Sequence, residues 1–190
     1  MSSFYIGLVH YPVLNKHNET VLTSVTNLDI HDIARSASTY GVNKYFIITP
    51  DKTQEEYILK IINFWQSEKG LTYNPDRSLA LSKIIITDSI ESSIKLITTQ
   101  EEMQPIVIST TAKIMDNQIT FDEIRNLHNE NQPLLLLFGT GHGLTDSIHS
   151  AADYVLQPVN GVGDYNHLSV RSAVAIILDR ISSAVYKGRN

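Results

Sequence analysis

The stretch PLLLLFGTGHGL, residues 133–144, decides the fold class, because a short apolar run there ends in a loop with three glycines. An uninterrupted apolar run such as Pro133–Phe138 is typical of a strand that is buried on both faces of a parallel sheet. Similar runs recur along the chain. They span Phe4–Val9, Tyr45–Thr49, Lys83–Thr87, Pro105–Ser109 and Tyr154–Pro158.

Segments with helix signals lie between these runs. The segment Asn27–Tyr40 repeats its apolar residues at helical spacing and is followed by Gly41 as a stop. A segment from Leu168 to about residue 187 carries a broad apolar stripe. Capping residues predict further helix starts at Thr53 with Glu56, at Asp88, and at Thr120 with Glu123.

Strands and helices therefore alternate throughout the chain. This order predicts an α/β fold, with a mostly parallel sheet, helices on both of its faces, and one domain over residues 1–190. The segments between the predicted elements that carry neither pattern are Tyr11–Thr26, Gly70–Arg77 and Asn160–His167.

Composition excludes several classes of protein. Of the 190 residues, 42% are hydrophobic, which is enough for a sizeable core and excludes a disordered chain. The net charge of −5 argues against a broad basic surface for nucleic acid, so any RNA contact should be local or shared with a partner. The chain has no cysteine, which excludes disulfides, thiolate zinc sites and a cysteine nucleophile. The seven histidines are scattered, and we predict no metal site.

The start of the sequence, MSSFYIGLVHYPV, has no basic segment before its apolar run, and this run stops at Pro12. Neither a signal peptide nor a membrane span has this pattern. We therefore expect a protein of the cytoplasm with no membrane partner.

Ligands of open α/β sheets bind beyond the carboxyl ends of the strands. Polar or glycine-rich loops follow three late strands, at Ser109–Ala112, Phe138–Leu144 and Leu156–His167. The glycine spacing is not that of the dinucleotide fingerprint, and the lysine of a phosphate-binding P-loop is missing. Ordinary turn chemistry and a Rossmann-type nucleotide site remain alternatives for the glycine loop.

Two polar segments lie earlier in the chain. His31, Asp32 and Arg35 share the solvent side of the first predicted helix, which is typical of a surface ion pair. The segment Tyr73–Arg77 contains the turn residues Asn-Pro-Asp. The same residue types also suit a phosphate or a base that is flipped out of its stack.

Three stretches together resemble the SPOUT superfamily of RNA methyltransferases. These are DIHDIARSASTYGV (residues 29–42), LLLLFGTGHGLT (134–145) and VLQPVNGVGDYNHLSVRSAVAIILDRI (155–181). Arg35 and Gly41 match the first family motif, whereas Asp29 and His31 replace its Asn and Gly. Gly141 stands where the ribose-methylating branch has glutamate, and Ser169 where it has asparagine. These two departures leave methylation of a base open beside ribose 2′-O transfer.

The whole chain is similar to a small bacterial SPOUT group described as tRNA (guanine-N1)-methyltransferase-like. The strings GLVHYPV, TNLDIHDIAR, YNPDR, FGTGHGL and GDYNHLSVRSA carry this likeness from end to end. The resemblance implies a C-terminal deep trefoil knot, S-adenosyl-L-methionine as the cofactor, RNA and in particular tRNA as the partner, and a homodimer. The rival interpretation is a catalytically silent SPOUT-like module that binds S-adenosylmethionine or RNA.

The resemblance also implies roles for individual residues. The implied catalytic residues are Arg35, Asp29 and Asp164, with Asp76 as a further candidate base. The implied cofactor-binding residues are Ser109, Thr110, Thr111, Phe138, Gly139, Thr140, Gly141, Gly143, Leu144, Leu156, Pro158, Leu168 and Ser169. The implied substrate-binding residues are His31, Asn74, Asp76, Arg77, Tyr165 and Asn166.

Overall fold

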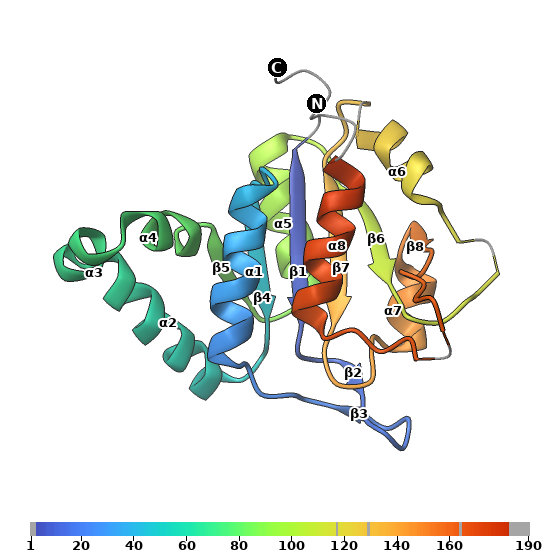
Figure 1. Ribbon diagram of the computed structural model, residues 1–190, viewed down its shortest axis with the longest axis horizontal. Helices are drawn as coiled ribbons and strands as arrows, with labels where there is room; N and C mark the ends of the chain where they lie inside the picture. Colours follow the sequence, from blue (N-terminus) through green and yellow to red (C-terminus); the bar gives the residue numbers. More distant parts are fainter. Residues whose placement is uncertain (1–2, 117, 129, 164, 183–190) are drawn as a thin grey trace.

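The computed structural model of the chain describes residues 3–116, 118–128, 130–163 and 165–182 (Figure 1). Its centre is a six-stranded sheet in the order β5-β4-β1-β7-β6-β8, in which every pair of neighbouring strands is parallel. The strands are β1 (Phe4–Val9), β4 (Lys44–Ile48), β5 (Ile84–Thr87), β6 (Ile106–Thr110), β7 (Leu134–Gly139) and β8 (Tyr154–Leu156). The predicted parallel sheet is confirmed, and each strand lies within two residues of its expected bounds.

Helices cover both faces of the sheet, as predicted. Helices α1 (Asn27–Thr39) and α8 (Val170–Ser182) lie side by side on one face, while α5 (Ile90–Glu101) and α7 (Asp146–Ala151) lie on the other (Figure 1). Helix α6 (Phe121–His128) packs against α8. Helices α2 (Lys52–Gln66), α3 (Glu68–Tyr73) and α4 (Pro75–Leu81) form an arm that extends beyond the β5 edge (Figure 1).

The core consists of two apolar clusters, one on each face of the sheet. Side chains of a strand alternate between the faces, so Ile6 and Leu8 of β1 pack beneath α1 and α8, whereas Tyr5 and Val9 pack beneath α5 and α7. All four are essentially inaccessible to solvent. Burial on both faces explains why the strands read as continuous apolar runs in the sequence.

The prediction of an irregular segment at Gly70–Arg77 is wrong, because this segment is mostly helical. Ser67 caps α3 by accepting a hydrogen bond from the Gly70 amide, and Asn74 caps α4 by accepting one from the Arg77 amide. Pro75 then stands in the first turn of α4, where its missing N–H costs nothing. The turn residues therefore start a helix here.

Two predicted helix caps also differ from the observed ones. Asp51, rather than Thr53, caps α2 by accepting from the Thr53 and Gln54 amides. Ser89, rather than Asp88, caps α5 by accepting from the Ser92 amide. The predicted capping box at Thr120 and Glu123 is confirmed, since each side chain accepts a hydrogen bond from the other residue's amide.

A small hairpin follows β1, within the segment expected to be irregular. Its strands β2 (Val13–Leu14) and β3 (Thr20–Val21) pair antiparallel, and Val13 also bridges to Leu144. The hairpin lies at the end of the sheet where the strands have their carboxyl ends (Figure 1). It thus borders the loops that the sequence marked for function.

Within the described residues, no helix has both the length and the apolar character that crossing a membrane requires. The same residues hold no group of three or more His, Cys, Asp or Glu side chains placed to bind a metal ion.

Candidate functional site

Three loops of the predicted cofactor site begin side by side at one edge of the sheet. Strands β7, β6 and β8 are neighbours, and Ser109 of β6 lies in register with Leu137 of β7 and Val155 of β8. Thr110 is paired with Leu156 in the next position. Since all strands are parallel, the chain leaves all three at the same end of the sheet. The structure thus brings together segments that are far apart in the sequence.

The glycine loop, residues 139–144, needs its glycines for different reasons. A Cβ atom at Gly139 would lie 2.6 Å from the Leu144 nitrogen, so only glycine allows the loop to fold back so closely. Gly141 has φ +59°, and a Cβ there would lie 2.8 Å from the Leu14 carbonyl oxygen. At Gly143, with φ +104°, a Cβ would have no heavy atom within 4 Å. The space beside the Gly143 Cα is therefore empty, whereas its amide and carbonyl are hydrogen-bonded to Thr140 and Leu14.

The hairpin fixes this loop through main-chain hydrogen bonds. The His142 amide donates to the Leu14 carbonyl at 2.8 Å, and the Leu14 amide donates to the Gly143 carbonyl at 2.9 Å. The Thr140 hydroxyl donates to the Val9 carbonyl at 3.0 Å. The loop is consequently attached both to the hairpin and to the end of β1.

Most of the predicted cofactor-binding side chains are already engaged inside the protein. Phe138, Leu144, Leu156 and Pro158 are buried. The Ser109 hydroxyl lies 2.9 Å from Nδ1 of His149, and the Thr110 hydroxyl donates to the Leu137 carbonyl at 2.9 Å. The Thr111 hydroxyl accepts a hydrogen bond from the Lys113 amide. Few of these side chains are therefore left to contact a ligand at this edge of the sheet.

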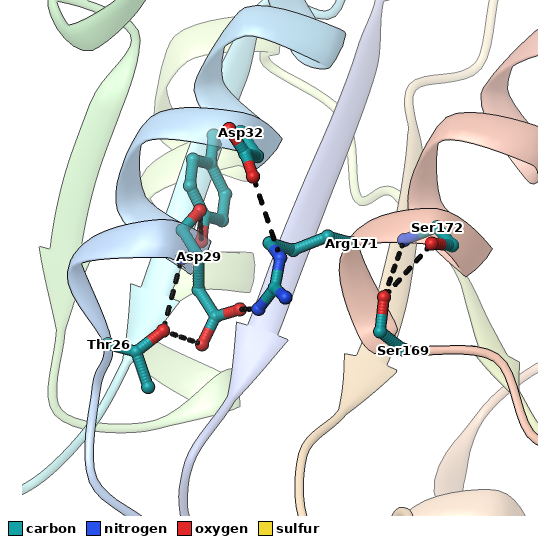
Figure 2. A network of polar contacts seen from close by, with 7 residues as sticks. Thr26, Asp29, Asp32, Ser169, Arg171 and Ser172 are labelled. Atoms are coloured by element: carbon teal, nitrogen blue, oxygen red, sulfur yellow. Dashed lines mark hydrogen bonds and ion pairs between the residues drawn. The ribbon is translucent and has the colours of Figure 1, made fainter.

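The start of α8 lies at the same end of the sheet as these loops (Figure 1). Ser169 accepts a hydrogen bond from the Ser172 amide at 3.3 Å, and the two hydroxyls lie 3.0 Å apart (Figure 2). Both Leu168 and Ser169 are exposed. Ser169 thus acts as a cap of α8 and keeps an accessible position beside the loops.

His10 is a fully buried histidine that follows β1 behind the glycine loop. Its Nδ1 lies 3.2 Å from the Thr23 hydroxyl, which shares a hydrogen bond with the Thr140 hydroxyl. Burial lowers the pKa of His10 to about 4, against the opposing influence of the Asp29 charge and of a hydrogen bond with Thr23. The imidazole is therefore neutral at pH 7, and its Nε2 has no hydrogen-bond partner among the described residues.

The side of α1 that faces α8 carries a network of paired charges, which we call the α8 flank (Asp29, Asp32 and Tyr40). Arg171 of α8 donates to the buried Asp29 carboxylate at 2.8 Å and lies 3.5 Å from the Asp32 carboxylate (Figure 2). The second Asp29 oxygen accepts from the Thr26 hydroxyl at 2.6 Å. The predicted base Asp29 is thus part of a clasp between the two helices.

The opposite side of α1 faces the arm and forms what we call the α4 flank (His31, Arg35 and Ser38). A helix turns by about 100° per residue, which places these three positions together and away from the α8 flank. The His31 ring packs edge-on to Trp65 at 5.7 Å between ring centroids. The guanidinium of Arg77 lies over the same indole at 4.9 Å. The structure therefore unites the predicted residues His31, Arg35 and Arg77.

The other predicted substrate-binding residues fall into two groups. One lies at the start of α4, next to this flank, and the other lies in the segment before α8. Asn74 caps α4, and Asp76 is exposed in the first turn of α4. Tyr165 is 79% exposed, and the Asn166 side chain accepts a hydrogen bond from the Gly161 amide at 3.0 Å. The predicted catalytic residue Asp164 lies outside the described residues.

The comparisons with known proteins agree with this arrangement. The sequence profile of a family described as SAM-dependent RNA methyltransferase matches residues 3–183. The chain belongs to this family.

Two relatives of this RNA methyltransferase chain illustrate its range of lengths. An uncharacterized protein of Aquifex aeolicus is 39% identical over 180 residues, which make up 94% of this chain and 88% of the relative. A protein of Oleidesulfovibrio alaskensis named tRNA (guanine-N(1)-)-methyltransferase is 41% identical over 94% of this chain. The match covers 42% of that second relative, so this chain spans less than half of its length.

The fold of the methyltransferase is also found among solved structures. The SpoU methyltransferase AviRb from Streptomyces viridochromogenes, solved in complex with AdoMet, superimposes with a TM-score of 0.58 at 16% identity. The superposition covers 99% of this chain and 59% of AviRb. The likeness at this low identity shows that the two proteins share a fold.

The residues of the glycine loop fit the methyl donor of the family. S-adenosylmethionine carries an adenine, which needs an apolar slot and main-chain hydrogen bonds rather than a phosphate cradle. A Cβ at Gly143 would meet open space, and buried Leu144, Leu156 and Pro158 supply apolar surroundings. Two surface cavities, of about 420 and 460 Å³, lie elsewhere, against Ile119 with Tyr154 and against Lys52 with Lys95.

Sequence reasoning missed two residues of the methyltransferase, Arg171 and Trp65, that hold other candidate site residues in place by direct contact. Arg171 pairs with a carboxylate 142 positions earlier in the chain, and no local pattern reports such a contact. Trp65 stands at the end of α2, where it contacts His31, Arg77 and Tyr73. A signal for Trp65 was present, because it is the single tryptophan of the chain and stands on a helix next to the segment Tyr73–Arg77.

Proposed function

We propose that this RNA methyltransferase transfers a methyl group to a base nitrogen of tRNA, with guanine N1 as the acceptor. The observation that carries the proposal is the match of the family over residues 3–183. A relative that bears the name tRNA (guanine-N(1)-)-methyltransferase supports the choice of substrate. Gly141, which stands where the ribose-methylating branch has glutamate, favours a base over a ribose hydroxyl.

The proposed methyl-donor site consists of the main chain of three loops and the start of α8. Thr110 and Thr111, the glycine loop and residues 156–158 would surround the adenosine, with Leu168 and Ser169 closing one side. The adjacency of β6, β7 and β8 supports this assignment. When bound, S-adenosylmethionine supplies a methyl group that its sulfonium has already activated for direct displacement. The chain's own task is then to position the accepting nucleotide and to assist the loss of its proton.

We assign to Arg35 the contact with an RNA phosphate near the nucleotide that accepts the methyl group. Its side chain is exposed, and it makes no ion pair among the described residues. A guanidinium keeps its proton at all physiological pH values, so it binds an anion rather than acting as a base. Asp29 and Asp164 are the proposed bases. For Asp29 this role requires that the Arg171 guanidinium leave its carboxylate.

The resemblance to SPOUT enzymes extends the proposal to the assembly. We propose that residues 1–190 form one methyltransferase domain with a C-terminal trefoil knot, and that it acts as a homodimer in the cytoplasm. Helices α1 and α8 offer a surface for a second copy, because they lie side by side on the outside of the sheet (Figure 1). Leu28 is 58% exposed at the start of α1, and Leu168 is 46% exposed just before α8.

Transfer of a labelled methyl group from S-adenosylmethionine to bulk tRNA tests the proposed function. We expect the wild-type protein to label tRNA, and we expect Arg35→Ala to lower the rate by about 100-fold, the typical effect of losing one positioned charge contact. Calorimetry should show unchanged binding of S-adenosylmethionine to the variant. Arg35→Lys serves as the matched control and should retain part of the rate.

Two outcomes would contradict the proposal. A wild-type protein that binds S-adenosylmethionine but labels no RNA would favour the silent SPOUT-like module. A preference for NAD or ATP over S-adenosylmethionine in the calorimeter would refute the assigned cofactor site.

A further inference from the structure

Aromatic and cationic side chains of the arm and of α1 meet at the α4 flank. The Trp65 and Tyr73 rings lie 6.3 Å apart between centroids, with an interplanar angle of 44°. Tyr73 is 80% exposed, although a tyrosine ring is one of the larger apolar surfaces that a protein can bury. We call Trp65, Tyr73, Arg77, His31 and Arg35 the stacking cluster. Its outermost ring presents a broad face to solvent.

The stacking cluster also carries two arginines whose charges are not neutralised. The guanidinium of Arg77 lies over the Trp65 indole, and neither Arg77 nor Arg35 forms an ion pair among the described residues. Arg171, on the other side of α1, contacts two carboxylates. The arm thus leaves cations free next to an aromatic surface, and this combination suits a nucleotide, which offers a phosphate and a base.

Buried polar atoms without partners concentrate at the same place. Four such atoms lie on α1 and α4, which pack against each other: Nδ1 of His31, Oγ of Ser38, Nε of Arg77 and Oγ of Ser78. Buried polar atoms in native proteins nearly always have a hydrogen-bond partner, so a concentration of exceptions calls for an explanation. A ligand with several donors and acceptors would satisfy the atoms that lie nearest to the surface.

His31 is held in its neutral form, which can hydrogen-bond to such a ligand both as a donor and as an acceptor. Burial, and next the positive charge of Arg77, lower the pKa of His31 below its usual value. The neutral imidazole offers one donor and one acceptor, which is the pattern displayed by the edge of a base.

We infer that the stacking cluster binds an unpaired nucleotide of the RNA substrate, with the base against Tyr73 and Trp65 and the phosphate against Arg77 and Arg35. This inference rests on the proposed function for RNA as the substrate and adds a binding site outside the methyl-donor loops. The cluster shares Arg35 with the proposed reaction site, so it would hold a nucleotide next to the one that is methylated. An RNA ligand is favoured over a protein because the free cations and the unpartnered polar atoms accompany the exposed ring.

The single tryptophan of the chain makes the site directly observable. Trp65 belongs to the stacking cluster, so all intrinsic tryptophan fluorescence arises there. Titration of the full-length protein with a ten-nucleotide oligouridylate, which has little structure of its own, should change this fluorescence in a saturable way. A duplex RNA of the same length should have a much smaller effect, because its bases are already stacked.

Variants of two cluster residues then connect the fluorescence signal to the cluster. We expect Tyr73→Ala to weaken oligouridylate binding by about 5- to 100-fold, the range that removal of one base-stacking ring produces. Arg77→Gln should weaken it by a similar factor and should also reduce the dependence of binding on salt. The matched controls are Tyr57→Ala and Lys60→Gln, which change an exposed ring and an exposed cation of α2 at positions outside the cluster.

The outcomes separate this inference from the proposed function. Methyl transfer to tRNA without any fluorescence response, and with unchanged binding by Tyr73→Ala, would overturn the stacking site and leave the methyltransferase function intact. The cluster would then be a surface for a protein partner. A fluorescence response that Tyr73→Ala abolishes, in a protein that transfers no methyl group, would support the RNA site and refute the proposed reaction.

Discussion

The two flanks of α1 differ in how completely their polar groups are paired. On the α8 flank, Asp29 and Asp32 share the Arg171 guanidinium, and the Tyr40 hydroxyl donates to Asp179 of α8. On the α4 flank, His31 Nδ1 and Ser38 Oγ are buried without a partner among the described residues. One helix with one apolar stripe thus has one flank whose polar groups are paired with α8 and another flank where buried polar atoms have no partner among the described residues. Unsatisfied groups in a native structure commonly mark functional positions.

The largest effect that we expect is a loss of folding stability at acid pH, caused by the buried His10. His10, which senses the Asp29 charge, has a pKa of about 4, below the value of about 6.5 for an unfolded chain. The unfolded state therefore binds the proton first, and stability is lost as pH falls from about 6.5 to about 4. Above that window the histidine makes no contribution to the pH dependence. The loss amounts to about 3 kcal/mol.

Urea unfolding at several pH values measures this loss. The decline between pH 6.5 and 4 should be about 3 kcal/mol shallower in His10→Gln than in the wild-type protein. His31→Gln on the α4 flank is the matched control, and because His31 is only partly buried its effect on the slope should be smaller. Equal slopes for all three proteins would show that His10 is not held neutral by burial.

The next effect concerns the ion pair of the α8 flank. Arg171→Gln leaves the buried Asp29 carboxylate without its cation, and we expect unfolding free energy to fall by about 2 kcal/mol, below the full cost for a wholly buried pair because Arg171 is partly exposed. Asp32→Asn is the control, since the Asp32 side chain is 49% exposed and its contact is longer. Its effect should stay within about 0.5 kcal/mol. A stable Arg171→Gln protein would remove the distinction between the flanks.

The smallest effect concerns helix α4, which packs against the α4 flank. Ser78→Ala removes a buried hydroxyl that has no partner among the described residues, so stability should stay the same or rise by about 0.5 kcal/mol. Ser93→Ala, in α5, removes an equally buried hydroxyl that is hydrogen-bonded to Thr87 at 2.8 Å and should cost about 1 kcal/mol. Thermal unfolding distinguishes the two variants. Equal destabilisation would mean that the Ser78 hydroxyl has a partner after all.

The sheet could be predicted from the sequence because each strand carries its own signal. Burial on both faces makes the apolar runs continuous, and helical spacing is equally local in Asn27–Tyr40. Helices α3 and α4 of the arm were not predicted, because Gly70 and the turn residues near Asn74 usually interrupt helices. At Gly70 a Cβ would lie 2.5 Å from the Phe64 carbonyl oxygen, so close packing of α3 against α2 requires glycine within a helix. Only the tertiary structure contains that information.

The same distinction holds for the candidate site. The glycine loop could be located from the sequence, since its position after a late strand is a local feature. The clasp from Asp29 to Arg171 joins residues 142 positions apart, and the contact of Trp65 with Arg77 depends on how three helices of the arm turn. Single-sequence patterns describe neither kind of contact. For this reason the sequence named His31 and Arg77 as separate candidates but did not show that Trp65 joins them.

The hairpin of β2 and β3 has a consequence for the glycine loop beside it. Glycine-rich segments are usually flexible, yet His142 and Gly143 exchange main-chain hydrogen bonds with Leu14 on both sides of the turn. The loop is therefore preorganised by a neighbouring piece of backbone before any ligand arrives. A small molecule that enters such a loop loses little binding free energy to the conformational entropy of ordering it.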